Sequence, residues 1–107
     1  MRIFAEQAFD LVGSDQKVWA RIYEPLLEPD GRAWACFAEI DEPLSWYAPA
    51  YGASGLQAVT LGLKLLSMWL YSSEEYARKE IGWKRQFGGD LGLPAIHQYL
   101  DVAPYPF

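Results

Sequence analysis

The sequence predicts an α+β domain, in which an antiparallel β-meander of about four strands packs on one long helix and a short second helix follows. Two observations predict this class. Residues 2–12 and 15–24 are rich in strand-forming residues and alternate with the period of two that is typical of strands. Residues 54–71 repeat apolar side chains at helical spacing. A chain of 107 residues, 51% of them apolar, suffices for one core, so we expect residues 1–107 to form a single domain.

Residues 2–12 and 15–24 are predicted to form a hairpin around Gly13-Ser14, because a two-residue loop that begins with glycine is typical of a type II′ turn. This loop fixes the register of the two strands. One face of the hairpin then carries opposite charges and aromatic pairs in matched positions, which stabilises cross-strand pairing. The predicted pairs on this face are Asp10–Lys17, Ala8–Trp19, Glu6–Arg21 and Phe4–Tyr23.

Residues 32–40 are predicted to form the third strand, which ends at Asp41-Glu42-Pro43. One face of it carries Trp34, Cys36, Ala38 and Ile40, and the other carries Ala35, Phe37 and Glu39. The aromatic segment 46–52 is predicted to be a loop. This loop could cover the main helix, line a ligand pocket or serve as an interface hot spot, and we favour the first of these roles.

Ser54 and Gln57 form a capping-box pattern at the start of a helix that we expect to run to about Tyr71. Its polar stripe is narrow, so we expect this helix to be covered from more than one direction. A short helix is predicted over 73–80, with favourable Glu–Arg and Glu–Lys pairs four residues apart. A fourth strand over 81–87, a loop over 88–94, a terminal helix over 94–100 and an aromatic tail over 103–107 complete the prediction.

Charge and cysteine content restrict the function classes. The net charge is −5, and residues 1–45 hold nine acids against four bases. Such an acidic chain repels nucleic-acid phosphate, so we expect no nucleic-acid binding, and a basic protein partner fits better. The single Cys36 permits no internal disulfide, and no segment is apolar enough for a signal peptide or a membrane span. We therefore expect a cytoplasmic protein that does not bind a membrane.

No residue pattern predicts catalysis, a metal site or a cofactor. His97 is the only histidine and has no partner at metal-ligand spacing. Cys36 lies among apolar residues of a predicted strand, where an inert buried thiol is expected. The glycines of the 88–92 segment lack the lysine and the spacing of a phosphate-binding loop. The acids near residues 24–42 are interpreted as a solvated rim.

Two short motifs resemble those of a known family. A Tyr-Gly-x-(Asp/Ser)-x-Leu-Gln-Ala helix start at Tyr51–Ala58 and a Gly-Asp-Leu-Gly-(Phe/Leu)-Pro motif at Gly89–Pro94, after a tryptophan-containing strand, resemble a family of small bacterial proteins known as a domain of unknown function. Ser54 stands where that family has Asp, and Leu93 replaces its Phe. Asp and Ser are interchangeable helix N-caps, so the first departure favours a structural role. The resemblance implies a β-meander with one long helix and a returning strand, and it implies no activity.

The strongest functional indication is the outer sheet face, where apolar side chains with charged neighbours are typical of an interface. We expect the interaction residues to be Phe4, Glu6, Trp19, Arg21, Tyr23, Phe37 and Glu39. The leading hypothesis is a non-enzymatic interaction domain, with a basic protein or a second copy of the chain as partner and an immunity- or antitoxin-like role as one form. The alternative is a small-molecule binder or hydrolase with a pocket at Trp46, Tyr47, Tyr51 and Asp90. The chain's own tail or second helix could also cover the outer face.

Overall fold

The predicted class is confirmed: the chain folds as an antiparallel sheet packed against one long helix, with a short second helix. The structure is a computed structural model, and it describes residues 1–93. Within these residues the sheet has seven strands rather than about four, in the order β3-β4-β2-β1-β6-β7 with β5 on β4. The elements are β1 (Ile3–Leu11), β2 (Lys17–Tyr23), β3 (Leu26–Leu27), β4 (Trp34–Ile40), β5 (Trp46–Gly52), α1 (Gly55–Tyr71), α2 (Glu74–Ala77), β6 (Ile81–Trp83) and β7 (Gln86–Phe87).

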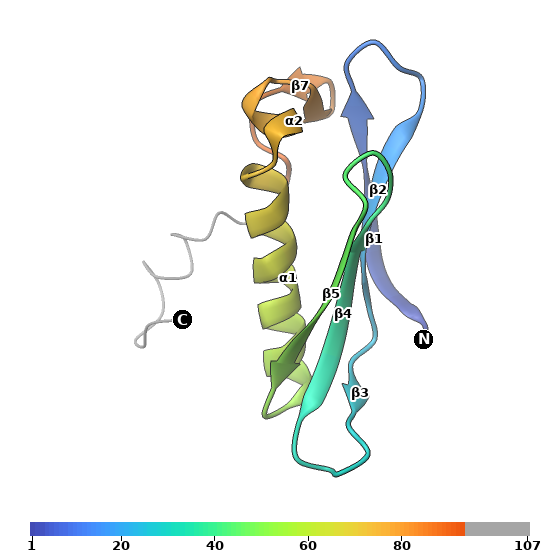
Figure 1. Cartoon of the computed structure of the whole chain (residues 1–107), viewed down its shortest axis with the longest axis vertical. Helices are drawn as coiled ribbons and strands as arrows, with labels where there is room; N and C mark the ends of the chain where they lie inside the picture. Colours follow the sequence, from blue (N-terminus) through green and yellow to red (C-terminus); the bar gives the residue numbers. More distant parts are fainter. Residues whose placement is uncertain (94–107) are drawn as a thin grey trace.

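Helix α1 lies on one face of the sheet, mainly over β4 and β5 (Figure 1). We call this the inner face and the opposite one the outer face. The core between the helix and the inner face contains Phe9, Val18, Ala20, Ile22, Cys36, Ala38, Ile40, Ala58, Leu66 and Leu70. The described residues cover α1 mainly from the sheet side, and Leu56, Met68 and Trp69 are exposed. The expected cover from a second direction is limited, within residues 1–93, to the C-terminal end of α1, where α2 and Leu91 pack against Tyr71.

Small residues let α1 approach the sheet closely. Gly62 of α1 lies over Cys36 of β4, and a Cβ atom at Gly62 would be 2.9 Å from the Cys36 Sγ. Gly52 of β5 lies against the first turn of the helix, where a Cβ would be 2.6 Å from the backbone nitrogen of Ala58. The helix therefore contacts the sheet backbone at Gly52, and at Gly62 it lies directly on the Cys36 side chain.

The predicted hairpin register is confirmed from Asp10–Lys17 to Ala5–Ile22. The predicted pair of Phe4 with Tyr23 is wrong, because a bulge between residues 3 and 5 places Ile3 opposite Tyr23. The two-residue turn is also wrong. A longer connection joins the strands, and Gly13, with φ of 73°, is the third residue of a turn that the Ser14 N–H closes on the Leu11 carbonyl.

The aromatic segment predicted as a loop is strand β5, which pairs with β4 along its whole length. Pro49 suggested a loop, because proline cannot donate a backbone hydrogen bond. Here Pro49 lies in a strand whose second edge has no partner among the described strands, and proline is tolerated at such an edge.

The capping of α1 is confirmed in its first half: the Ser54 hydroxyl accepts the Gln57 N–H at 3.1 Å. The Gln57 side chain reaches one residue further back than predicted and accepts the Ala53 N–H at 2.5 Å. Helix α2 is shorter than the predicted 73–80. Its predicted Glu74–Arg78 ion pair is present, at 2.7 Å.

The predicted fourth strand over 81–87 is in fact a hairpin of β6 and β7. Lys84 and Arg85 both adopt positive φ angles, 54° and 61°, and reverse the chain after Trp83. Neither residue is a glycine or an asparagine, so the turn carries no sequence signal. The predicted terminal helix, the aromatic tail and His97 lie outside the described residues.

Candidate functional site

One row of side chains crosses the outer face over four strands. Glu6 of β1 lies opposite Arg21 of β2, and Arg21 lies opposite Glu39 of β4. Glu39 in turn lies opposite Tyr47 of β5. Because directly opposed residues share a face of the sheet, these four side chains all project outward. Arg21 is thus the centre of the outer face.

Three carboxylates surround the Arg21 guanidinium. Its Nη1 donates to Glu39 at 2.6 Å, and its two terminal nitrogens hold both oxygens of Asp41 at 2.7 and 3.0 Å. Its Nε donates to Glu6 at 3.3 Å. The Arg21 side chain is only 14% exposed, so these bonds are partly shielded from water. Three carboxylates against one guanidinium leave two negative charges in excess.

We call Arg21 with Glu6, Glu39 and Asp41 the Arg21 network, and its hydrogen bonds hold these charges in fixed positions. Bonding to Asp41 and Glu39 raises the pKa of Arg21, while the guanidinium lowers the pKa of Asp41. The Tyr23 hydroxyl donates to Glu39 at 2.7 Å, and this bond to a carboxylate raises the pKa of Tyr23. The bidentate hydrogen bond between Arg21 and Asp41 restricts both side chains, so the outer face presents a fixed charge pattern.

The network includes Asp41, which sequence reasoning assigned to a solvated rim. A signal was present: Asp41 lies two residues after Glu39 and four after Phe37, and it directly follows the strand that carries them. Alternation continued by one residue would have placed Asp41 on the outer face.

Large apolar side chains accompany the charges. Trp19, opposite Ala8, is 40% exposed, and Tyr47 and Tyr51 are 50% and 54% exposed. The Phe37 ring is half-buried and stacks on the Tyr47 ring with centroids 5.5 Å apart. Leu26, a residue that sequence reasoning did not select, lies opposite Ala35 and is also exposed. We call these residues with the Arg21 network the outer-face patch.

The structure places six of the seven predicted interaction residues on this face. Glu6, Arg21, Tyr23 and Glu39 are joined by hydrogen bonds, and Trp19 and Phe37 lie on neighbouring strands. The seventh residue, Phe4, lies at the bulge and is exposed. Helix α2 does not cover the face, because it packs against β6 and the end of α1.

The four residues of the predicted ligand pocket lie in three different places. Tyr47 and Tyr51 belong to the outer-face patch. Trp46 lies opposite Ile40 and faces inward, where its ring packs on Trp69 with centroids 5.5 Å apart. Asp90 accepts the Gly92 N–H at 2.8 Å and contacts the Tyr71 hydroxyl at 3.3 Å. The structure does not bring these four side chains into one pocket.

Trp46 does line a different cavity, of about 290 Å³, between the end of α1, the start of α2 and the turn before β5. We call it the tryptophan pocket. Its lining residues are Ile40, Leu44, Trp46, Trp69, Ser72, Ser73, Glu74 and Glu75.

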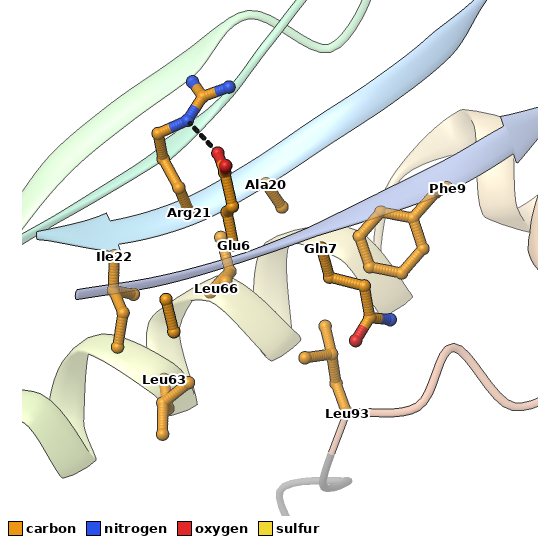
Figure 2. A pocket seen from close by; sticks show the side chains of 10 residues that line it. Glu6, Gln7, Phe9, Ala20, Arg21, Ile22, Leu63, Leu66 and Leu93 are labelled. Carbon is orange, nitrogen blue, oxygen red and sulfur yellow. Dashed lines mark hydrogen bonds and ion pairs between the residues drawn. The ribbon is translucent and has the colours of Figure 1, made fainter. Parts of the chain in front are cut away.

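A second, apolar cavity of about 150 Å³ lies between β1, β2 and the middle of α1. Figure 2 shows Phe9, Ile22 and Leu63 on the helix side of the sheet, and Glu6 and Arg21 pointing away on the other side. Gln7 beside it donates to the Leu91 carbonyl at 2.8 Å. The cavity is bounded by Leu93, the last described residue, and we assign it no role.

Cys36 and groups of acidic side chains are the described candidates for a nucleophile or a metal site. Cys36 is fully buried, and burial raises the pKa of its thiol, which disfavours the reactive thiolate. Among residues 1–93 no three histidine, cysteine or acidic side chains are grouped to hold a metal ion. Neither described helix has the length and apolar character needed to cross a membrane.

The fold defines a class of protein: a small α+β domain with one helix-covered sheet face and one aromatic, acidic sheet face. The family can also be stated. A family model described as a domain of unknown function, DUF6968, matches residues 5–95, and the chain belongs to this family. The matched residues include most of the first hairpin as well as the long helix. Neither a curated protein nor a solved structure matches the chain.

Proposed function

We propose that the chain is a non-enzymatic interaction domain that binds a basic protein partner through the outer-face patch. One observation carries the proposal: exposed aromatic side chains surround a fixed charge network that has two excess negative charges. Aromatic residues and arginine dominate the energy of protein interfaces, and charged groups fix the orientation of the partner.

The fixed geometry of the network favours an interface over a merely soluble surface. A charge on a flexible side chain must be ordered when a partner binds, which reduces affinity. Here Arg21 already orders Glu6, Glu39 and Asp41. Lysine and arginine side chains of a partner could therefore bind the remaining lone pairs of these carboxylates at lower entropic cost.

A basic partner has more support than a second copy of the chain. Two copies that met through this patch would bring excess negative charge against excess negative charge, which is unfavourable. An immunity- or antitoxin-like protein, which covers a cationic surface, is one form of this function. We further propose that it acts in the cytoplasm of a bacterial cell, where a free Cys36 is kept reduced.

The alternative, a small-molecule binder or hydrolase built on Trp46, Tyr47, Tyr51 and Asp90, has less support. Its residues lie in three places, and the one carboxylate among them, Asp90, is bonded to the Gly92 N–H and the Tyr71 hydroxyl rather than placed beside the three aromatic residues.

The test is a pull-down from source-cell lysate with quantitative mass spectrometry. The baits are the wild type, Trp19→Ala, and Leu56→Ala as a control, since Leu56 is an exposed apolar residue of α1 that belongs to neither the outer-face patch nor the cavity lined by Trp46. We expect a basic protein on the wild-type and control baits, its loss on Trp19→Ala, and weaker capture as salt increases. If every captured protein is retained by Trp19→Ala and by Phe37→Asp, both folded, the outer-face assignment is wrong.

A further inference from the structure

The tryptophan pocket differs in place and chemistry from the outer-face patch. Its residues come from the end of α1, the start of α2, and the turn and strand start around Trp46, which points to the inner face. It shares no residue with the Arg21 network. A ligand here would thus contact different side chains from a partner bound to the Arg21 network.

Two indole rings form the aromatic wall of this pocket. Trp46 and Trp69 lie with ring centroids 5.5 Å apart and planes tilted by 33°. The Trp69 side chain is 48% exposed, although it belongs to a helix that packs on the sheet. The face of an indole ring is electron-rich and attracts a cation placed within about 6 Å of it.

The polar lining of the pocket is acidic. Glu74 is bound to Arg78 at 2.7 Å, whereas the Glu75 side chain has no ion pair or hydrogen bond within residues 1–93. The hydroxyls of Ser72 and Ser73 donate to the carbonyls of Met68 and Leu70. Both hydroxyl protons are therefore already donated to backbone carbonyls, and the carboxylates are the polar groups that determine which ligand binds.

We propose that the tryptophan pocket binds an alkylammonium group. Its alkyl part would pack on the indole rings and on Ile40 and Leu44, and its positive charge would be balanced by Glu75. An anion would meet two carboxylates, and a neutral apolar ligand would leave the Glu75 carboxylate beside it without compensation. The volume of about 290 Å³ is at the small end for ligand sites and suits a single headgroup.

The group could belong to a free amine or to an alkylated lysine side chain, and the experiment separates these sources. The full chain is titrated, with backbone and indole amide shifts followed by NMR, against tetramethylammonium chloride, n-butylammonium chloride and a short peptide containing trimethyl-lysine. The neutral probe is 1-butanol. We expect saturable shifts at the tryptophan pocket with the cations and at least tenfold weaker binding of 1-butanol. Tighter binding of the peptide than of the free cations indicates a protein side chain, and the reverse indicates a small metabolite.

Variants locate the site. Trp69→Leu keeps an apolar side chain but removes the ring face, and Glu75→Gln removes the charge; each should weaken cation binding about tenfold or more. Glu28→Gln makes the same charge change away from the pocket and should leave the affinity unchanged. Trp19→Ala should also leave it unchanged, so this proposal and the outer-face proposal can fail separately.

Three results would overturn the proposal. They are equal binding of 1-butanol and the cations, unchanged cation binding in both Trp69→Leu and Glu75→Gln, and the absence of any saturable shift at the pocket.

Discussion

The two faces of the sheet use opposite kinds of side chain at neighbouring positions of the same strands. On β2, Ala20 faces inward and Trp19 outward; on β4, Ala38 faces inward and Phe37 outward. Both inner alanines are buried and belong to the core that the sheet shares with α1. The outer face has no helix within the described chain, so nothing there limits side-chain size.

This difference shows which residues serve the fold. The inner face buries Phe9, Val18 and Ile22 completely or nearly so, as a core requires. On the outer face Trp19, Tyr47 and Tyr51 are 40%, 50% and 54% exposed, so these rings contribute less to the described core. An exposed tryptophan that is not needed for folding is available for contact with a partner.

The difference between the two faces is tested most directly by truncating one large side chain on each face and comparing the losses of stability. Phe9→Ala should reduce the free energy of unfolding by about 3–5 kcal/mol, because it leaves a cavity beneath α1. Trp19→Ala should cost about 1 kcal/mol or less, because the side chain is already 40% exposed. Urea unfolding followed by circular dichroism measures both. Equal losses would mean that the outer face is covered in solution.

A second prediction concerns the close contact of α1 with β5. Gly52→Ala should cost about 2–3 kcal/mol, since the added Cβ would be 2.6 Å from a backbone nitrogen that cannot move independently. Gly55→Ala is the matched control: its Cβ would lie 3.5 Å or more from its neighbours, and alanine favours a helix. We expect Gly55→Ala to be neutral or slightly stabilising. A mild effect at Gly52 would show that the helix can shift away from the sheet.

On the outer face, Arg21→Met should destabilise the fold by about 1–2 kcal/mol. It leaves the carboxylates of Glu6, Glu39 and Asp41 close together without their counter-charge, although each remains partly solvated. Glu6→Gln removes only the longest of the contacts and should cost less than 0.5 kcal/mol. Thermal unfolding in low and high salt measures both, and high salt should reduce the effect at Arg21. If Arg21→Met matches wild type at low salt, the network does not stabilise the fold.

The smallest expected effect is on the pH dependence of stability. Bonding to Lys17 and to the Arg85 N–H lowers the pKa of Asp10, as bonding to Arg21 lowers that of Asp41. Above a pH of about 4, where these groups are ionised in both states, their stabilisation is complete. As the pH falls further, the unfolded chain takes up protons first, and this stabilisation is lost. Asp41→Asn should therefore flatten the decrease in stability below pH 4, whereas Asp15→Asn, an exposed acid in the loop between β1 and β2, should not. Parallel profiles for wild type and Asp41→Asn would contradict this.

Much of the fold was predictable because alternation and charge pairing agree over the first hairpin. The charge pairs Asp10–Lys17 and Glu6–Arg21 favour the same register as the apolar pattern. The predicted register is therefore correct, although the predicted turn is wrong. The start of the long helix followed from Ser54, whose side chain caps the first turn.

The remaining differences have local physical causes. Strand β5 was missed because Pro49 disfavours a strand everywhere except at an edge, and the edge is a property of the whole sheet. The β6–β7 turn was missed because Lys84 and Arg85 adopt a backbone conformation that neither residue prefers. On the outer face, alternation predicted which side chains would share the surface. It could not predict that Asp41, beyond the strand end, would form the two-pronged bond to Arg21.

The contact of Cys36 with Gly62 makes the single thiol a built-in reporter of helix undocking. With no exposed surface and a raised pKa, Cys36 should be alkylated only from molecules in which α1 has lifted from β4. Its labelling rate in native buffer would then measure the free energy of that opening, and comparing it with the global free energy of unfolding would show whether helix and sheet separate as one cooperative unit.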